Sequence, residues 1–280
     1  MKRFAAAGTV AGALVLVLVI AGSAGARAQA TRIQLSGPMT AAQEVPAPSG
    51  DVSAARGTFT GSVTRSGADA VLTWRLTFSG LTGAAGAAHI HTGVRGQAGP
   101  VAVPLCGPCE SPASGTATLT PSVLEALQAG GAYANVHTAA NGAGEIRGQI
   151  GVTASIRTAL NSRQEVPRPR GAVARASGRF TATATKSGTT GTLAWRLTFG
   201  RLTGAATAAH VHIARRGVAG PVAVPLCGPC RSGARGTATL RANVLTALEA
   251  GRAYVNVHTR RNPAGEVRGQ IAAVPLTLSP

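Results

Sequence analysis

The chain has 280 residues and carries 27 Lys or Arg against 9 Asp or Glu, which gives a formal net charge of +18. Such a charge attracts anionic partners. Aromatic residues make up only 3% of the sequence, however, and leave few rings for base stacking. Because no nucleic-acid-binding motif is found either, specific recognition of nucleic acid is the least favoured of these partnerships.

The first 30 residues are expected to form a secretory signal peptide. Lys2 and Arg3 precede an apolar run at 10–21, and the sequence AQA at 28–30 fits a cleavage site before Thr31. The alternative is a signal anchor, which the short run disfavours, since a spanning helix needs about 20 apolar residues. We therefore expect an exported protein, secreted or held in the periplasm or cell envelope, with no transmembrane segment after cleavage.

The remaining chain repeats itself at a spacing of 121 residues without a gap. Trp74 matches Trp195, and the sequence EIRGQI at 145–150 matches EVRGQI at 266–271. A period of this length is a whole domain rather than a solenoid unit, so each copy must bury its own core. We expect domains at 31–150 and 151–280.

The fold class expected for each copy is all-β, an antiparallel sandwich of Greek-key type. Leu72, Trp74 and Leu76 alternate with polar residues, as in a strand with one dry face. Strands are predicted at 58–63, 72–78, 87–91, 101–105, 115–119, 132–138 and 145–150. One short helix per copy is predicted at 121–129 and 241–250, the first with Thr120 at its N-cap.

All six histidines of the chain lie in one motif that occurs twice. His89 and His91 stand two apart on a predicted strand and share one face, while His137 lies on a separate strand. His210, His212 and His258 repeat the arrangement. Three imidazoles completed by a water are typical of a copper or zinc site.

Further polar side chains are expected beside the histidines, on the outer face of the sheet. Alternation places Tyr133, Asn135, Glu145 and Arg147 opposite the core-facing residues, and the second copy repeats them as Tyr254, Asn256, Glu266 and Arg268. The alternative to a metal site is a hydrogen-bonded polar lattice that ties strands and loops together. The sequence leaves both readings open.

At this point the chain resembles a known family. The sequences QEVP at 43–46, AHIH at 88–91, YANVHT at 133–138 and GEIRGQ at 144–149 look like successive hallmarks of a CHRD domain, the module named for chordin. The second copy repeats them at 164–167, 209–212, 254–259 and 265–270. The resemblance implies an extracellular all-β module and brings no specific partner with it.

A looser similarity links the first copy to copper,zinc superoxide dismutases. Residues 78–83 leading into His89 and His91 resemble the stretch of those enzymes that supplies two copper ligands from one strand. Residues 93–100, where such an enzyme carries zinc ligands, contain no His, Asp or Glu. The similarity therefore implies a copper half-site at most.

The four cysteines form two CGPC motifs, with Cys106 and Cys109 in the first copy and Cys227 and Cys230 in the second. In an exported chain we expect a local disulfide within each pair. Closing so small a loop contributes only about 2 kcal/mol. A metal role for the thiolates, thiol–disulfide exchange and pairing between the copies remain as alternatives; exchange lacks the βαβ context of thioredoxin.

Charge distinguishes two copies that are otherwise alike. Residues 31–150 hold six Arg against six Asp or Glu, whereas residues 151–280 hold eighteen Lys or Arg against three Glu, a net of +15. The basic residues are expected largely in loops, among them Arg163, Arg168, Arg170, Arg175, Arg215, Arg216, Arg231, Arg235, Arg241, Arg252, Arg260 and Arg261. They favour an anionic polysaccharide or envelope polymer as the partner of the second domain; a merely solubilising role is the alternative.

Two functions of different classes follow. The first is an exported, non-enzymatic binding or structural protein built from two CHRD-like domains. The second is a metalloprotein that holds copper or zinc on the two histidine triads, with thiol–disulfide exchange ranking below both. Neither a Ser-His-Asp constellation nor a paired-carboxylate site is evident in the sequence.

Overall fold

The computed structural model describes Met1 and residues 32–66 and 69–278, so the predicted signal peptide lies outside the described residues apart from Met1. The first copy contains eight strands: β1 (Arg32–Thr40), β2 (Arg56–Ser66), β3 (Asp69–Ser79), β4 (Ala85–Thr92), β5 (Val101–Cys106), β6 (Ala113–Thr118), β7 (Ala132–Thr138) and β8 (Ile146–Gln149). The second repeats them as β9 (Gly151–Asn161), β10 (Ser177–Ser187), β11 (Thr190–Gly200), β12 (Ala206–Ile213), β13 (Val222–Cys227), β14 (Ala234–Leu240), β15 (Ala253–Thr259) and β16 (Val267–Ile271).

Each copy is an antiparallel sandwich of two four-stranded sheets, which confirms the predicted fold class. In the first copy β1, β2, β3 and β6 form one sheet, and β8, β7, β4 and β5 form the other. In the second copy the sheets are β9-β10-β11-β14 and β16-β15-β12-β13. The sheets touch at one corner, where Thr40 pairs with Arg147 and, in the second copy, Asn161 pairs with Arg268.

Two separate cores fill the space between the sheets. The alternation in β3 acts as predicted, because Leu72 and Leu76 are fully buried and Trp74 is 4% exposed. Phe59 joins them from β2, and Ile90 joins from the facing sheet. A matching cluster around Phe180 and Trp195 forms the core of the second copy.

The strands were predicted except for the first of each copy. The seven predicted segments correspond to β2 through β8, while β1 and its counterpart β9 were missed. β1 contains Gly37 and Pro38, which weaken a strand pattern. Its alternate residues Ile33, Leu35 and Met39 are nonetheless buried, and it pairs with β2 over its whole length.

A short helix connects the two sheets of each sandwich. Helix α1 (Pro121–Ala129) has the predicted bounds, with the Thr120 hydroxyl accepting from the Val123 N–H and Gly130 ending the helix at φ 71°. Helix α2 (Ala242–Glu249) is shorter than predicted by one residue at each end. Two further single turns of 3-10 helix, η1 (Ala41–Gln43) and η2 (Ser162–Gln164), follow β1 and β9.

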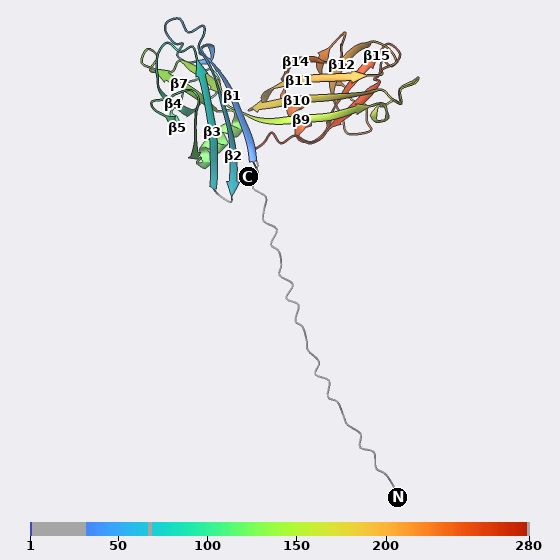
Figure 1. Cartoon of the computed structure of the whole chain (residues 1–280), viewed down its shortest axis with the longest axis horizontal. Coiled ribbons are helices and arrows are strands. Elements are labelled where there is room, and N and C mark those ends of the chain that lie inside the picture. The colour runs from blue at the N-terminus through green and yellow to red at the C-terminus, as the bar shows by residue number, and fades with distance from the viewer. Residues whose placement is uncertain (2–31, 67–68, 279–280) are drawn as a thin grey trace.

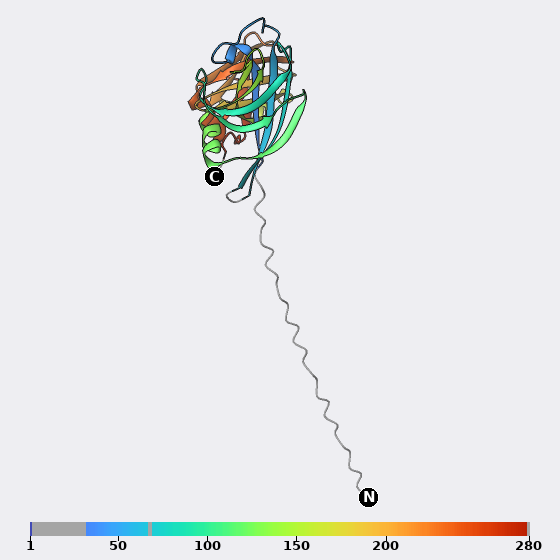
Figure 2. The ribbon, with the colours of Figure 1, turned by 90° about the vertical axis from the view of Figure 1, so that its left-hand side faces the viewer.

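The two sandwiches lie side by side and are joined through a shared strand pairing (Figure 1). Residues Gln34 to Ser36 of β1 pair with Gly151 to Thr153 of β9, so all sixteen strands belong to one connected sheet. Along the long axis the first sandwich lies in front of the second (Figure 2). The chain's last described residue, Leu278, returns to the first core and donates its N–H to Gln128 Oε1 at 2.6 Å.

Candidate metal centre

Two neighbouring strands position the three histidines of each copy. His89 and His91 lie on β4 and His137 lies on β7, which pairs with β4 so that Ala87 faces His137 and His91 faces Tyr133. Ile90 points into the core and is fully buried. The histidines therefore lie on the opposite face of the sheet, and β12 and β15 carry the second triad in the same register.

The imidazole nitrogens of each triad converge. One nitrogen from each of the three rings lies within 4.8 Å of the other two, in both copies. His89 Nδ1 is 3.1 Å from His137 Nε2, and His210 Nδ1 is 3.1 Å from His258 Nε2. Two nitrogens on one tetrahedral zinc ion lie about 3.3 Å apart, given bonds of about 2.0–2.1 Å. This pair is spaced as metal ligands are.

Backbone carbonyls hold two of the rings in the orientation that a metal requires. His91 Nδ1 donates to the Gly99 carbonyl at 2.9 Å, and His137 Nδ1 donates to the Gly142 carbonyl at 3.0 Å. Because a carbonyl oxygen can only accept, the proton of each ring is on Nδ1 and the electron pair is on Nε2. Metal-bound histidines are usually oriented through such a bond from the other ring nitrogen.

Some polar atoms at this face are buried without a hydrogen-bond partner. They are His91 Nε2 and Asn135 Oδ1 in the first copy, and His212 Nε2, Asn256 Oδ1 and Glu165 Oε2 in the second. His91 is only 7% exposed and Asn135 only 1%. A buried acceptor without a partner lowers the free energy of unfolding by about 1–3 kcal/mol. A bound ion or a hydrogen-bond donor would pair with these atoms and remove that cost.

The triads are electrically suited to bind a cation. Burial lowers the pKa of His89, and the neighbouring imidazoles of His137 and His91 lower it further. Burial likewise lowers the pKa of His137, and it lowers that of His210 to about 4. These rings are neutral at neutral pH, which leaves their electron pairs available to a metal.

The other polar side chains beside the triad form a lattice whose hydrogen bonds are internal. Tyr133 stacks on His91 with the ring centroids 5.0 Å apart, and the Arg147 guanidinium lies 3.4 Å above the other side of the tyrosine. Arg147 donates to the carbonyls of Val94 and Gln97. These bonds fasten the loop between β4 and β5 over the sheet. The second copy repeats the stack with His212, Tyr254 and Arg268.

Gly99 is the point where this loop closes. Its N–H donates to the Tyr133 hydroxyl at 3.0 Å, and its carbonyl accepts from His91. A Cβ at this position would meet the Thr92 carbonyl oxygen, so only glycine fits. The loop at 93–100, which has no ligand side chain of its own, acts through its backbone.

Glu145 is the centre of a second hydrogen-bond network. Its carboxylate accepts from the N–H and hydroxyl of Thr82, from the Thr138 hydroxyl and from Asn141 Nδ2. Burial alone would raise the pKa of Glu145, but these donors outweigh it and hold the pKa below the usual value. In the second copy Glu266 accepts from Thr203, Thr259 and Asn262 in the same way.

The expectation that this polar patch lies on the outer surface is wrong. Tyr133, Asn135, Glu145 and Arg147 do lie opposite the core, but their exposed fractions are at most 2%. The same holds for Tyr254, Asn256, Glu266 and Arg268. Strand alternation gives the face on which a side chain lies and says nothing of the loops that cover that face.

Sequence reasoning missed the part of Glu44 and Asn141 in this region; strand alternation does place Gln149 on the same face as Arg147, but not its hydrogen-bond partners. Glu44 is 6% exposed and accepts from the Val45 N–H, and its pKa is raised because burial outweighs its hydrogen bonds. Asn141 links Glu145 to the backbone of Ser49. Gln149 donates to the carbonyls of Gly93, Gly130 and Ala132. All three act across long sequence separations, which no local pattern reveals.

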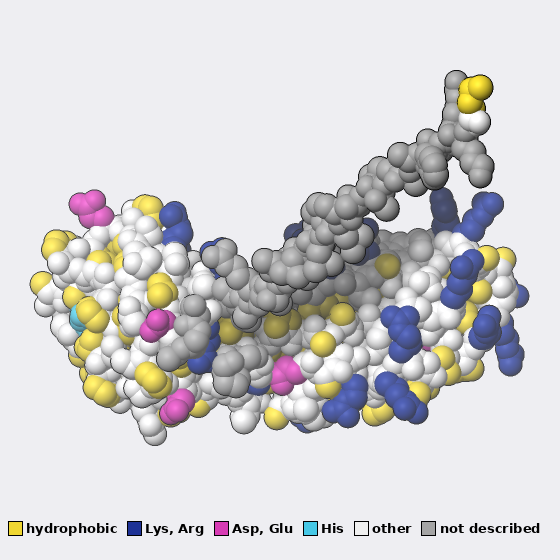
Figure 3. Space-filling view, turned by 90° about the horizontal axis from the view of Figure 1, so that it is seen from below, with side chains coloured by type: hydrophobic (Ala, Val, Ile, Leu, Met, Phe, Trp, Pro, Cys, Tyr) yellow, Lys and Arg dark blue, Asp and Glu magenta, His cyan; other side chains and the backbone are white. Residues whose placement is uncertain are grey.

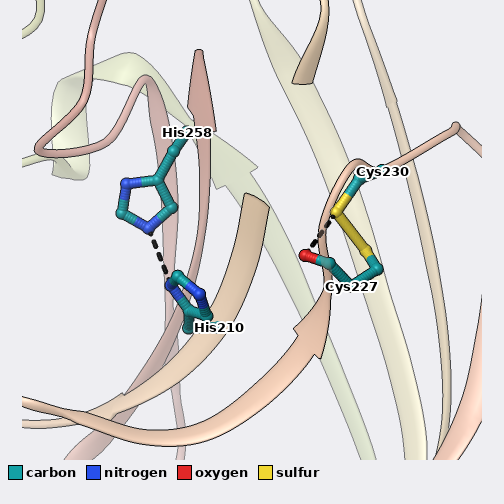
Figure 4. Close-up of a disulfide and its surroundings, with 4 residues drawn as sticks. All are labelled: His210, Cys227, Cys230 and His258. Carbon is teal, nitrogen blue, oxygen red and sulfur yellow. Dashed lines mark hydrogen bonds between the residues drawn. A yellow bond between two sulfur atoms is a disulfide. The ribbon is translucent and has the colours of Figure 1, made fainter. Parts of the chain in front are cut away.

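Each CGPC motif closes on itself as a disulfide. Cys106 bonds to Cys109 and Cys227 bonds to Cys230, so the chain's four cysteines are all paired within their own copies. In Figure 4 the Cys227–Cys230 bridge lies near the facing imidazoles of His210 and His258. Cys227 ends β13 and pairs with Ala209 on β12, next to His210. The bridge thus braces the strand beside the triad without contributing a thiolate to it.

Fold and site together define a tandem all-β sandwich protein with one partly buried histidine cluster in each sandwich. The family model of the CHRD domain matches residues 35–150 and 156–271. The chain therefore belongs to the CHRD domain family. No curated protein and no solved structure matches it significantly. Within the described residues, no helix is long and apolar enough to cross a membrane.

Proposed function

We propose that this protein is an exported, non-enzymatic metal-binding protein that holds one copper or zinc ion on the three histidines of each domain. The observation that carries the proposal is the buried Nε2 of His91, which has no hydrogen-bond partner and lies in a cluster of converging imidazoles. A polar lattice built only for stability would pair such an atom.

The contact between His89 and His137 fits the same proposal. Without a metal, His89 Nδ1–H donates to His137 Nε2, which carries an electron pair because its Nδ1 proton points at Gly142. When His89 adopts its other tautomer, with the proton on Nε2, both nitrogens are free for one ion. Metal binding by these neutral rings is therefore expected to need no net release of a proton at neutral pH, and to weaken in acid, where protons compete for the same nitrogens.

A binding role is favoured over a catalytic one because the neighbouring carboxylates are occupied. Glu145 accepts hydrogen bonds from three residues. Glu44 is buried and bonded to Val45 and Asn135. Neither is free to act as a general base for a metal-bound water.

Export is supported by two features. The first is the pattern of residues 1–30, which is that of a cleaved signal peptide. The second is the pair of disulfides, since such bonds persist in oxidising compartments and are rare in the cytosol.

Metal binding is tested with untagged protein. The protein is stripped with a chelator, titrated with Cu(II) or Zn(II), desalted and then analysed for metal content. We expect two ions per wild-type chain. His89→Ala/His137→Ala and His210→Ala/His258→Ala should each retain one, and the fourfold variant none. Bound metal should also raise the stability of the wild type, by about 2.7 kcal/mol at one hundred times Kd.

The control is Asp51→Ala/Asp69→Ala, which removes two exposed carboxylates and leaves every histidine. It should bind as the wild type does. A wild type that retains no metal would contradict the proposal, and so would a fourfold variant that still retains two ions. Thermal unfolding of the metal-free proteins shows whether each variant is folded, which separates loss of ligands from loss of structure.

A further inference from the structure

A row of arginines crosses the outer face of the sheet β9-β10-β11-β14, well away from the histidines. Arg157 on β9 pairs with Thr181 on β10, Thr181 pairs with Arg196 on β11, and Arg196 pairs with Arg235 on β14. We call Arg157, Arg196 and Arg235 the arginine row; all three are exposed. Most arginines of the second copy were expected in loops, but Arg235 lies on β14.

The arginine row has no counter-charge within the described residues. Arg196 and Arg235 stand directly opposite each other on adjacent strands, a placement of like charges that is destabilising. The three acidic residues of the second copy are all occupied elsewhere. Glu249 pairs with Lys186 at 2.6 Å, whereas Glu165 and Glu266 are buried on the far side of the sandwich. The row is therefore free to pair with negative charges of another molecule.

The arginine row borders an open hollow of about 540 Å³ in this face. Ser155, Thr183 and Thr237, which carry hydroxyls, and the small residues Ala194 and Gly236 also line it. Figure 3 shows the Lys and Arg side chains gathered over the half of the molecule that the second domain forms. The face therefore presents guanidinium groups and hydroxyl groups next to one another.

The first domain has the same face with one arginine instead of three. The equivalent row there is Ser36, Thr60, Arg75 and Ser114, paired in the same register. Serines thus occupy the places of Arg157 and Arg235. The fold does not need arginine at either position, so these two residues point to a property of the second domain alone.

We propose that the arginine row is a binding site for an acidic polysaccharide. Guanidinium groups bind carboxylate and sulfate oxygens in a bidentate manner, and the hydroxyls around them suit the hydroxyls of a sugar. The row crosses four strands, so three strand spacings separate its ends, about 14 Å in all. That length exceeds a single small anion and fits a chain with repeated charges. Trp195 also lines the hollow, but it is only 7% exposed and leaves little ring surface for bases to stack on.

The test compares wild-type protein with Arg157→Ser/Arg235→Ser, which restores the residues of the first domain. The probes are dextran sulfate and polygalacturonate, with neutral dextran and double-stranded DNA for comparison, all in a chelator so that the metal proposal plays no part. We expect the wild type to bind both acidic polysaccharides, more weakly as salt rises. The variant should bind them about tenfold more weakly or worse, because it loses two charge-assisted contacts.

The matched control is Arg252→Ser/Arg260→Ser, which removes the same charge from the ends of β15 in the other sheet and leaves the row intact. It should retain nearly all of the affinity. An equal loss in both double variants would overturn the proposal, since binding would then follow net charge alone. Tighter binding to DNA than to either acidic polysaccharide would overturn it as well, as would no binding by the wild type.

Discussion

At the scale of single residues, the polar side chains of each domain separate into two kinds. Glu145, Arg147 and Gln149 have their hydrogen-bonding atoms engaged by backbone and hydroxyl groups. His91 and Asn135 each keep a buried atom without a partner. The two readings that the sequence left open thus apply to different residues: the first group forms the lattice, and the histidines form the candidate metal site.

The hydrogen bonds of Glu145 in the lattice should make the free energy of unfolding depend on pH. The pKa of Glu145 is held below the ordinary value of 4.5, so its contribution is fully present above that value and is lost as pH falls through the lower, folded pKa. Glu145→Gln should therefore lower the free energy of unfolding at pH 7 by about 1.5–3 kcal/mol. The deficit relative to wild type should shrink towards zero in acid, as measured by urea unfolding at a series of pH values.

Glu125→Gln is the control for that measurement. Glu125 is exposed on α1 and has no part in the network, so the same change of charge should have little effect at any pH. A Glu145→Gln protein as stable as wild type at pH 7 would contradict the assignment of Glu145 to the lattice, and so would a deficit that grows in acid.

At the scale of elements, local pattern was a good guide where one face of a strand is apolar. It located β3 through Leu72, Trp74 and Leu76, and it placed Ile90 in the core with the histidines opposite. It failed for β1, whose Gly37 and Pro38 obscure the alternation of its buried residues. That strand owes its place to pairing with β2.

The two helices offer a matched test of capping. The Thr120 hydroxyl accepts from the Val123 N–H at 3.4 Å, whereas Arg241 occupies the same position before α2 and makes no such bond. Thr120→Ala should lower the free energy of unfolding by about 0.5–2 kcal/mol. Arg241→Ala, measured by the same thermal unfolding, should change it far less. Equal effects of the two substitutions would show that the hydroxyl contributes nothing as a cap.

At the scale of the whole molecule, the chain ties its two domains together at several places. β1 and β9 pair across the joint, Val152 belongs to the first core, and Leu278 packs there as well. The second domain thus contributes residues to the first at both of its ends. Each disulfide, in contrast, stays within its own domain.

Export is a property of the whole chain and can be measured directly. The intact mass of protein recovered outside the cytoplasm should equal that of a chain beginning at Thr31. Cleavage is expected there because the apolar run at 10–21 is too short for a membrane anchor. Alkylation under denaturing conditions without reductant should label none of the four cysteines. Recovery with residues 1–30 still attached in the membrane fraction would contradict cleavage, and free thiols would contradict an oxidising compartment.

The sequence by itself determined the tandem repeat, the β-sandwich class and the shared face of His89 and His91, because these depend on periodicity and on alternation along one strand. Its motifs also carried the resemblance to the CHRD family. Only the tertiary structure decided that the polar patch is buried beneath a loop, that His91 Nε2 lacks a partner, and that Arg157, Arg196 and Arg235 form one row. These facts depend on strand register and on contacts between distant segments. A sequence read locally does not contain them.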